Sequence, residues 1–211
     1  MAGKTNINGT GYTVKGGKTS VGGTGYAIRG GKTKIGGTGY TISFYPDWYS
    51  QLKALAVGGT IVIDGMTWRV VNKTASAAVL GLDVIYSTTQ FGSNSTYAGS
   101  KLAAAASDFE ANKLTADTKA LLNSVTVKNV TGKVFVPTVE QFFTTGTAFS
   151  YYAAGQYNRP CKYNGVYTTY WTSSGSSSSE AYTVYSTGER NTSGASYSHG
   201  FRPHIEVNLT L

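Results

Sequence analysis

The sequence predicts an α+β chain in two parts. An N-terminal array of β-hairpin repeats, an all-β meander, precedes a domain of mixed short strands, two to three helices and long loops. Residues 3–16, 17–30 and 31–44 repeat without a gap at a period of 14, which is typical of a structural repeat. After them the apolar pattern alternates between strand-like and helix-like periods. The 27 glycines among 211 residues indicate many tight turns.

The first repeat predicts a hairpin closed by Asn8-Gly9. Such pairs favour a two-residue type I′ turn, because both central residues then need positive φ. With this turn, Ile7 lies opposite Thr10. Two residues further out, Thr5 lies opposite Tyr12.

The glycine pair between the first two repeats predicts that the hairpins continue into one meander. With Gly16-Gly17 as the second turn, Val14 lies opposite Thr19. The same turn places Tyr12 opposite Val21. Both turns then put the same side chains on one face, as a one-sided sheet requires.

The predicted array has one apolar face. We expect it to anchor the chain or to form an oligomer, through Ile7, Tyr12, Val14, Val21, Tyr26, Ile28, Ile35, Tyr40 and Ile42. Short strands with a single apolar face are not stable alone. The face must therefore be covered by copies of itself, with a trimer as the expectation for a fibre, or by another protein. In the alternative, the array folds back on the C-terminal domain.

Positive charge is concentrated in residues 1–46. This segment has no acidic residue, and it supplies +6 of the net charge of +8 through Lys4, Lys15, Lys18, Arg29, Lys32 and Lys34. Such a segment attracts nucleic acid, anionic wall polymers or an acidic protein surface. Nucleic acid is not favoured, because the interleaved aromatic residues repeat with the turns and fit a packed face better than a base-stacking platform.

The remaining elements divide into a junction and a domain. Residues 45–57 predict a short helical junction that begins at Pro46-Asp47, and residues 58–211 form the C-terminal domain. The expected strands are a hairpin over 60–71 and strands over 77–85, 133–137, 168–174, 181–186 and 201–209. The expected helices cover 101–113, a second segment capped by Thr115, and a third opened by the capping box Thr138–Gln141.

Six segments of residues 58–211 occur in a characteristic order: GGTIVIDGMTWRVV, VLGLDVI, YAGSKLAAAASDFEANKL, KVFVPTVEQFF, YWTSS and GFRPHIEVNL. In this order they resemble a family of C-type-lectin-like domains common in phages and prophages of Gram-positive bacteria, distantly like the formylglycine-generating-enzyme fold. The glycine-rich repeats resemble modules at the N-termini of phage structural proteins. The resemblance implies a virion component, such as a fibre, tail tip or capsid decoration, whose lectin-like domain faces the host.

In folds of this kind the late loops display the ligand surface. The candidate ligand-binding residues are Tyr151, Tyr152, Tyr157, Asn158, Arg159, Tyr163, Asn164, Tyr167, Arg190, Asn191, Tyr197 and His199. Tyrosine, asparagine, serine and glycine together form a composition typical of antibody-like binding surfaces. Alternatively, half of these tyrosines only cover the sheet. By resemblance, Trp171 and Arg202 are scaffold residues, Trp171 in the core and Arg202 bonding loop carbonyls or a carboxylate.

No set of catalytic or metal-binding residues stands out. Cys161 is the single cysteine, which excludes an intrachain disulfide and argues against the oxidase chemistry of the formylglycine-generating relatives. His199 and His204 have no evident third metal ligand, and the calcium motifs of C-type lectins, Glu-Pro-Asn and Trp-Asn-Asp, do not occur. We therefore expect no enzyme activity, no metal and no cofactor, although a wall-polymer-acting enzyme is kept as an alternative.

The N-terminus has no apolar segment of a signal peptide, and no stretch is long and apolar enough to cross a bilayer. We expect a protein made in the host cytoplasm and carried on the virion, without membrane insertion. The expected partners are other virion proteins, further copies of the chain, and a host cell-surface glycan or protein. A purely structural head-fibre or capsid decoration without a specific receptor is the main alternative.

Replacing Tyr12, Tyr26 and Tyr40 together by Ser tests the covered face. We expect the triple variant to dissociate the oligomer or to be lost from the particle, because three large apolar contacts are removed. Sedimentation of the purified protein and its recovery in purified particles measure this. Normal assembly of the triple variant would contradict the covered-face prediction.

Overall fold

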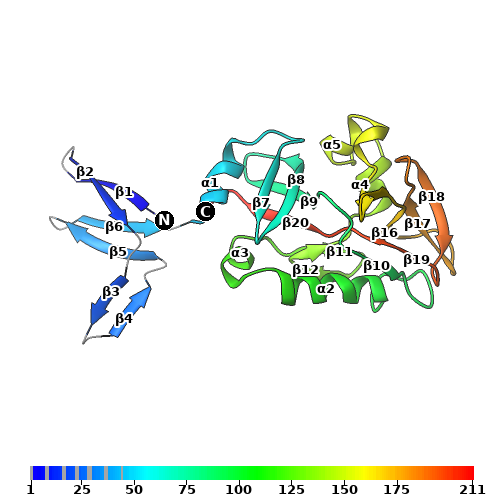
Figure 1. The fold of residues 1–211 in the computed structure, drawn as a ribbon, viewed down its shortest axis with the longest axis horizontal. Helices are drawn as coiled ribbons and strands as arrows, with labels where there is room; N and C mark the ends of the chain where they lie inside the picture. The colour runs from blue at the N-terminus through cyan, green and yellow to red at the C-terminus, as the bar shows by residue number, and fades with distance from the viewer. Residues whose placement is uncertain are drawn as a thin grey trace. The chain divides into compact units, whose positions relative to one another are not determined.

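The structure is a computed structural model, and it divides into two compact units, Met1–Ala54 and Leu55–Leu211 (Figure 1). It describes residues 45–211 in full. Before residue 45 it describes strands and their pairing over 2–7, 10–15, 18–21, 24–27, 30–35 and 38–43. In coarse terms the chain is a strand-rich α+β protein with few helices and open sheets, as the sequence predicts.

The three repeats each form a hairpin. Strand β1 (Ala2–Ile7) pairs with β2 (Thr10–Lys15), β3 (Lys18–Val21) with β4 (Thr24–Ala27), and β5 (Gly30–Ile35) with β6 (Thr38–Ser43), all antiparallel. In the first hairpin Ile7 lies opposite Thr10 and Thr5 opposite Tyr12, which is the predicted register. The glycine-bearing pairs at the turns lie outside the described residues.

The continuous meander is not found. Among the described strands each hairpin is a separate two-stranded sheet, so the predicted pairs Val14–Thr19 and Tyr12–Val21 do not form. Glycine adopts open and turned conformations with equal ease, so a Gly-Gly link between repeats permits a hairpin without enforcing one. The side chains of residues 1–44, and with them the predicted anchoring face, lie outside the described part of the chain.

The predicted junction contains a helix, α1 (Asp47–Ala54). It begins directly after Pro46, whose carbonyl oxygen accepts the backbone N–H of Tyr49 at 2.9 Å. A proline just before the first turn suits a helix start because the first helical N–H groups have no partner within the helix. Tyr49 and Leu52 are buried, and the ammonium of Lys53 lies 4.6 Å from the centre of the Tyr49 ring.

One five-stranded antiparallel sheet of Leu55–Leu211 combines early strands of the unit with its last strand. Its order is β13-β20-β9-β8-β7, with β7 Thr60–Ile63, β8 Met66–Lys73, β9 Ala77–Leu82, β13 Val134–Phe135 and β20 His204–Asn208. Asp64 and Gly65 both have positive φ, as the predicted hairpin turn requires. Strand β9 is almost wholly buried, which its continuous apolar sequence predicts.

A second five-stranded sheet carries the late part of the chain. Its order is β10-β19-β16-β17-β18, with β10 Ser87–Gln90, β16 Tyr170–Gly175, β17 Glu180–Val184, β18 Arg190–Gly194 and β19 Ser198–Phe201. The neighbours β16 and β19 are parallel, and the other pairs are antiparallel. Trp171 on β16 is 1% exposed and its Nε1 donates to the carbonyl oxygen of Thr89 at 2.8 Å, which confirms its core position.

The last strand of the sequence is divided between the two sheets. The pattern over 201–209 predicts one strand, but β19 ends at Phe201 and β20 begins at His204. Arg202-Pro203 separates them. Proline has no N–H to give to a ladder, so the first pairing ends here and the chain continues in the other sheet.

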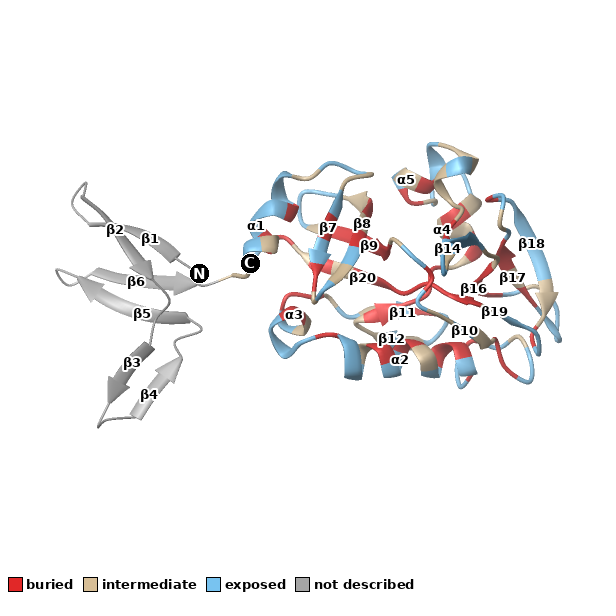
Figure 2. Ribbon diagram, in the orientation of Figure 1, coloured by how far each residue is buried: buried red, intermediate tan, exposed pale blue. Residues whose placement is uncertain are grey.

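Helix α2 (Lys101–Lys113) covers the junction of the sheets along one side of the unit (Figures 1 and 2). Its N-cap Ser100 accepts the backbone N–H of Ala103 at 3.0 Å. The ring of Phe109, on its buried face, lies edge-on to Trp68 and Phe201, with centroids 6.1 Å apart in both pairs. These contacts join one residue of each sheet to the same helix.

The remaining helices are short. Helix α3 (Ala116–Ala120) is capped by Thr115 as predicted, and α4 (Val139–Phe143) has the predicted capping box of Thr138 and Gln141. Further elements that the sequence does not predict are α5 (Ser150–Ala153), the 3₁₀ helix η1 (Gln156–Asn158), and the hairpins β11–β12 (Val125–Val127, Val130–Gly132) and β14–β15 (Lys162–Tyr163, Val166–Tyr167). None of the described helices is long and apolar enough to span a membrane.

Gly200 on β19 lies close to Ile85 and Tyr170, and replacing it by Ala tests this packing. A Cβ there would lie 2.8 Å from two Ile85 methyl carbons and 2.9 Å from Tyr170 Cβ. We expect Gly200→Ala to lower the free energy of unfolding by about 1–3 kcal/mol, the usual cost of overpacking. Urea denaturation of the full chain measures it.

The matched control is Gly155→Ala. No atom lies within 4 Å of a Cβ at Gly155, whose φ of 171° is extended backbone that any residue adopts. We expect this variant to stay within about 0.5 kcal/mol of the wild type. Equal stabilities of the two variants would show that β19 has room at Gly200.

Candidate ligand-binding surface

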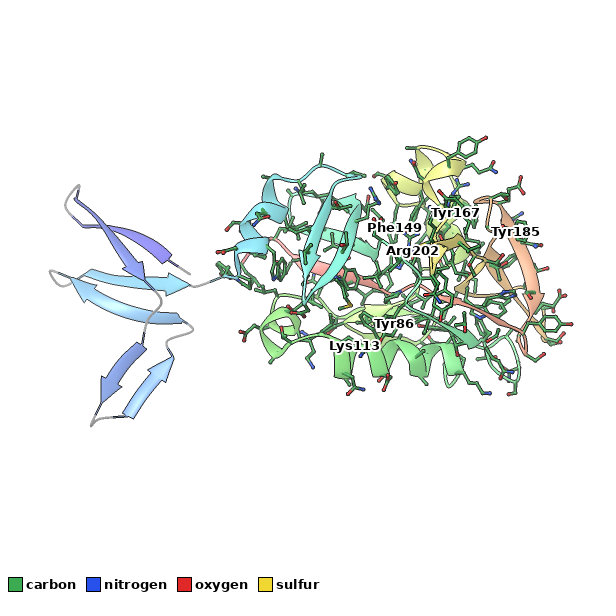
Figure 3. All side chains as sticks on the ribbon, in the orientation of Figure 1. Tyr86, Lys113, Phe149, Tyr167, Tyr185 and Arg202 are labelled. Carbon is green, nitrogen blue, oxygen red and sulfur yellow. The ribbon has the colours of Figure 1, made fainter. Side chains whose placement is uncertain are left out.

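The guanidinium of Arg202 lies in the interior, where β19 gives way to β20 (Figure 3), and the residue is 2% exposed. Its Nε donates to the carbonyl oxygen of Leu82 at 2.8 Å, and its Nη1 donates to Tyr170 Oη at 3.2 Å. The rings of Tyr152 and Tyr170 each lie 5.5 Å from its Cζ, within cation–π range. No carboxylate of Leu55–Leu211, all of which is described, bonds it. Carbonyl dipoles and aromatic faces therefore stabilise this charge.

Arg159 connects that interior to the late loops. Its carbonyl oxygen accepts from Tyr170 Oη at 2.7 Å and from Arg202 Nη1 at 3.5 Å. Its own guanidinium donates to the carbonyl oxygens of Phe142, at 3.0 Å, and of Gly188, at 3.4 Å. The main chain of Arg159 therefore bonds the buried Tyr170 and Arg202, and its side chain links α4 to the turn at Gly188.

His204 and Tyr152 form a second buried pair. His204 Nδ1 lies 3.2 Å from the carbonyl oxygen of Arg202, which can only accept, so Nδ1 carries the proton and Nε2 accepts from Tyr152 Oη at 2.8 Å. Burial lowers the pKa of His204 well below its usual range and raises the pKa of Tyr152 well above its own. Both side chains are thus neutral, and Tyr152, predicted as a ligand residue, belongs to the core.

Cys161 is also an interior residue. It is buried, and its Sγ donates to the carbonyl oxygen of Asp83 at 3.6 Å. The Asp83 carboxylate in turn accepts from Arg69 Nε at 2.6 Å. Burial raises the pKa of the Cys161 thiol, which disfavours the reactive thiolate.

The loop around η1 presents one tyrosine outward and turns its neighbours inward. Tyr157 is 89% exposed. On either side of it, Gln156 Nε2 donates to the carbonyl oxygen of Thr187 at 3.2 Å, and Asn158 Nδ2 donates to that of Tyr151 at 2.9 Å. These two bonds fix the loop on which the Tyr157 ring stands.

The hairpin β14–β15 presents a second tyrosine. Its turn residues Asn164 and Gly165 have φ of 49° and 84°, the positive values that a type I′ turn requires. Tyr167 is 56% exposed, with the ammonium of Lys162 lying 4.8 Å from its ring centre. Figure 3 shows Tyr167 and Tyr185 on the side of the unit that carries β17 and β18.

The hairpin β17–β18 contributes residues that the sequence analysis missed. Tyr182 lies opposite Thr192, and the guanidinium of Arg190 lies 5.7 Å from the centre of the Tyr182 ring. Beside them, Asn191 Oδ1 accepts the backbone N–H of Thr192 at 2.9 Å. The segment RNTSG has no alternating apolar residues, so no pattern signals that it pairs with AYTV and brings Thr192 to Tyr182.

Tyr197 and His199 follow this hairpin. Tyr197 is 66% exposed, and a Cβ on Gly194 would come within 3.3 Å of its ring, so the ring lies directly against the strand at this glycine. The half-buried His199 ring has its Nε2 2.7 Å from Ser193 Oγ and lies edge-on to Trp171 at 4.7 Å. Desolvation lowers the pKa of His199, so its imidazole is neutral at physiological pH.

The structure thus sorts the predicted ligand residues by exposure. The exposed ones lie on η1, on the β14–β15 hairpin, on β18 and on the turn that follows β18. Exposed are Tyr157, Asn164, Tyr167, Arg190, Asn191 and Tyr197; half-buried are Tyr151, Asn158, Arg159, Tyr163 and His199; buried is Tyr152.

The described residues contain no group of three or more His, Cys, Asp or Glu side chains that could hold a metal ion. The geometry of the late segment is that of a preformed surface with exposed aromatic rings and mixed polar groups.

Comparisons with models of protein families, with curated proteins and with solved structures found no match.

The buried His204 makes stability depend on pH. Its folded-state pKa is far below the value of about 6.5 expected in the unfolded chain, so at lower pH the unfolded state binds a proton that the folded state does not. We expect the free energy of unfolding to fall as pH drops below about 6.5, by up to about 1.4 kcal/mol per pH unit. Urea denaturation at pH 7.5, 6.5, 5.5 and 5.0 measures this slope.

The comparison variants are His204→Gln and His199→Gln. Removing His204 should flatten the slope between pH 6.5 and 5.0, whatever its effect at pH 7.5. Removing the half-buried His199 should flatten it less, because His199 loses less hydration on folding. Parallel slopes in His204→Gln and wild type would contradict a neutral, buried His204.

Proposed function

We propose that this protein is a non-enzymatic virion surface protein. Its N-terminal repeats dock on the particle, and its C-terminal unit binds a host cell-surface glycan or protein. The observation that carries the proposal is that exposed aromatic rings stand on segments held by specific hydrogen bonds. Tyr157, Tyr167 and Tyr197 are more than half exposed, yet each stands on a segment closed by specific backbone or side-chain bonds.

Exposed tyrosines on fixed segments are suited to recognition. A tyrosine ring contributes a large amphipathic contact area and loses little conformational entropy on binding, because it has only two rotatable side-chain bonds. Fixing the supporting loop beforehand lowers the entropic cost further. The bonds from Gln156 and Asn158 on one loop, and the type I′ turn at Asn164-Gly165 on the next, have this effect.

The interior chemistry supports binding rather than catalysis. The titratable side chains gathered under this surface, His204, Tyr152 and Cys161, have pKa values shifted by burial in the direction that keeps them neutral. Their hydrogen bonds run to protein atoms. Such groups support the surface mechanically and do not project reactive atoms toward a ligand.

The virion location rests on the sequence resemblance of both parts of the chain to phage structural proteins. The repeat segment adds a physical reason for docking. A two-stranded hairpin is marginal alone in water, and the hairpins form separate sheets. A partner surface that packs against the hairpins would stabilise them. Negative charge on that surface would attract the N-terminal segment, which is positively charged and has no acidic residue.

A structural decoration without a receptor is the second candidate. The observation in its favour is that Tyr152, Asn158 and Arg159, all predicted to bind ligand, are bonded within the protein instead. If the exposed tyrosines also serve only to cover the sheet, no receptor is needed.

The test is binding of the full, fluorescently labelled chain to intact Gram-positive cells. The variant carries Tyr157→Ser, Tyr167→Ser and Tyr197→Ser together. The control is Val62→Thr, which keeps the side-chain shape at an exposed position on β7, in the other sheet. We expect the triple variant to bind at least about tenfold more weakly, because aromatic anchors each contribute more than about 1 kcal/mol, and the control to match the wild type.

Wild-type protein that incorporates into particles but does not bind cells would turn the proposal toward decoration. Cell binding that the triple variant retains in full, with an unchanged free energy of unfolding, would reject the three tyrosines as the contact surface.

A further inference from the structure

The outer face of the β17–β18 hairpin carries the ring of Tyr182 and lies beside the ring of Tyr197. In an antiparallel pair, directly opposed residues share a face, so Tyr182 shares its face with Thr192, and Glu180 shares its face with Gly194. The intervening Ala181 and Thr183 are buried and define the inner face.

The ring of Tyr197 belongs to this outer face. A Cβ at Gly194 would point to the side of Glu180 and would meet Tyr197 Cε2 at 3.3 Å and Cδ2 at 3.4 Å. A Cβ at this position would be in tight contact with the ring, which would have to shift by a few tenths of an ångström. Because Tyr197 is largely exposed, its other side faces solvent. Gly194 and Thr192 are two residues apart, which is about 7 Å along a strand.

Polar groups frame the two rings. The exposed Arg190 lies 5.7 Å from the ring centre of Tyr182, and the exposed Glu180 flanks the other side of that ring along its strand. Thr192, exposed, lies between them on β18. One cation and one anion leave the face without net charge, with donors from arginine and acceptors from glutamate within the same small area.

The edge of this hairpin is not arranged to receive a peptide strand. The bonds Tyr185 N–H to Glu189 O, 2.8 Å, and Ala195 N–H to Ser179 O, 2.8 Å, set the ladder so that the main-chain groups of Thr192 and Gly194 point away from β17.

Two of these outward groups already have partners. Asn191 Oδ1 accepts the N–H of Thr192, and the carbonyl oxygen of Gly194 accepts the N–H of Tyr197, each at 2.9 Å. Occupied edge groups and a charged residue at the strand start oppose addition of another strand. An extended peptide is therefore a poor occupant for this hairpin.

We propose that Glu180, Tyr182, Arg190, Thr192, Gly194 and Tyr197 form a binding subsite for uncharged sugar rings, in which Tyr197, seated on Gly194, stacks on one ring and the polar groups bond its hydroxyls. The inference rests on the proposed binding function and names the ligand class for one part of that surface. A sugar ring offers an apolar C–H face to an aromatic ring and hydroxyls that both donate and accept. The neutral, mixed face of the hairpin matches that pattern, and its one cation and one anion together give no net attraction to an anionic glycan.

Stacking on Tyr197 needs no bound cation. The six residues contain a single carboxylate, and the described residues hold no cluster suited to a metal ion. Sugar binding at this subsite is therefore expected to persist in EDTA.

The experiment applies the full chain to an immobilised array of neutral and sialylated oligosaccharides, with and without EDTA. We expect binding to neutral oligosaccharides in both conditions. The variants are Tyr197→Ser, Tyr182→Ser and Gly194→Val, with Val62→Thr as the control. Gly194→Val keeps both tyrosines and displaces only the Tyr197 ring. Each of the three should weaken binding by about tenfold or more, with an unchanged urea midpoint and an unchanged control.

Several results would overturn the subsite. They are binding restricted to sialylated oligosaccharides, loss of binding in EDTA, or Gly194→Val binding at wild-type strength. A second measurement separates this inference from the broader function: cells are oxidised with periodate, which cleaves the vicinal diols of sugars. Cell binding that survives periodate leaves the binding function intact with a protein receptor and rejects the sugar subsite. Absence of cell binding together with absence of array binding rejects both.

Discussion

A buried positive charge without a carboxylate partner constrains the whole C-terminal unit. Removing a guanidinium from water is costly unless its donors are satisfied, and Arg202 meets that condition through carbonyl oxygens, a tyrosine hydroxyl and two aromatic faces. Leu82 comes from one sheet and Tyr170 from the other. The charge can be buried only if both sheets and the Arg159 loop are in place together. Arg202 therefore couples the position of the late loops to the folding of the core.

This coupling links the loops between the late strands to the core. Arg159 bonds Arg202 and Tyr170 through its main chain, and bonds Phe142 and Gly188 through its side chain. A loop fixed in this way transmits the rigidity of the core to the residues beside it. Preorganisation of this kind lowers the cost of binding, which is the physical reason to look for a ligand surface here.

The aromatic residues of the segment divide according to that geometry. Tyr152 and Tyr170 supply ring faces to the buried charge, whereas Tyr157, Tyr167 and Tyr197 have no such task and project outward. The same residue type thus stabilises the core and forms the exposed surface within about fifty positions of sequence. Composition alone does not distinguish these tasks.

The N-terminal repeats differ in kind from this unit. Their pairing is local, because within each hairpin the first strand bonds only to the second, which follows it closely in sequence. Local pairing is encoded by turn residues and needs no distant contact. Their association with one another or with a partner depends on surface contacts. A two-stranded hairpin does not supply enough such contacts to be stable alone.

By itself, the sequence determined the features whose physics is local. The register of the first hairpin follows from its turn, the capping box of Thr138 and Gln141 from hydrogen bonds three residues apart, and the helix over 101–113 from its period. Trp171 was also placed correctly in the core.

Tertiary structure alone decided what depends on distant partners. The pattern over 201–209 predicts one strand, and only the competing ladders of two sheets divide it at Arg202-Pro203. Likewise, RNTSG becomes a strand because AYTV lies beside it, which brings Thr192 to Tyr182 and Tyr197 onto the same face. Tyr152 is likewise buried through a partner distant in sequence, His204. A residue's neighbours in sequence limit its backbone conformation. Its exposure depends on segments that contact it only in the folded chain.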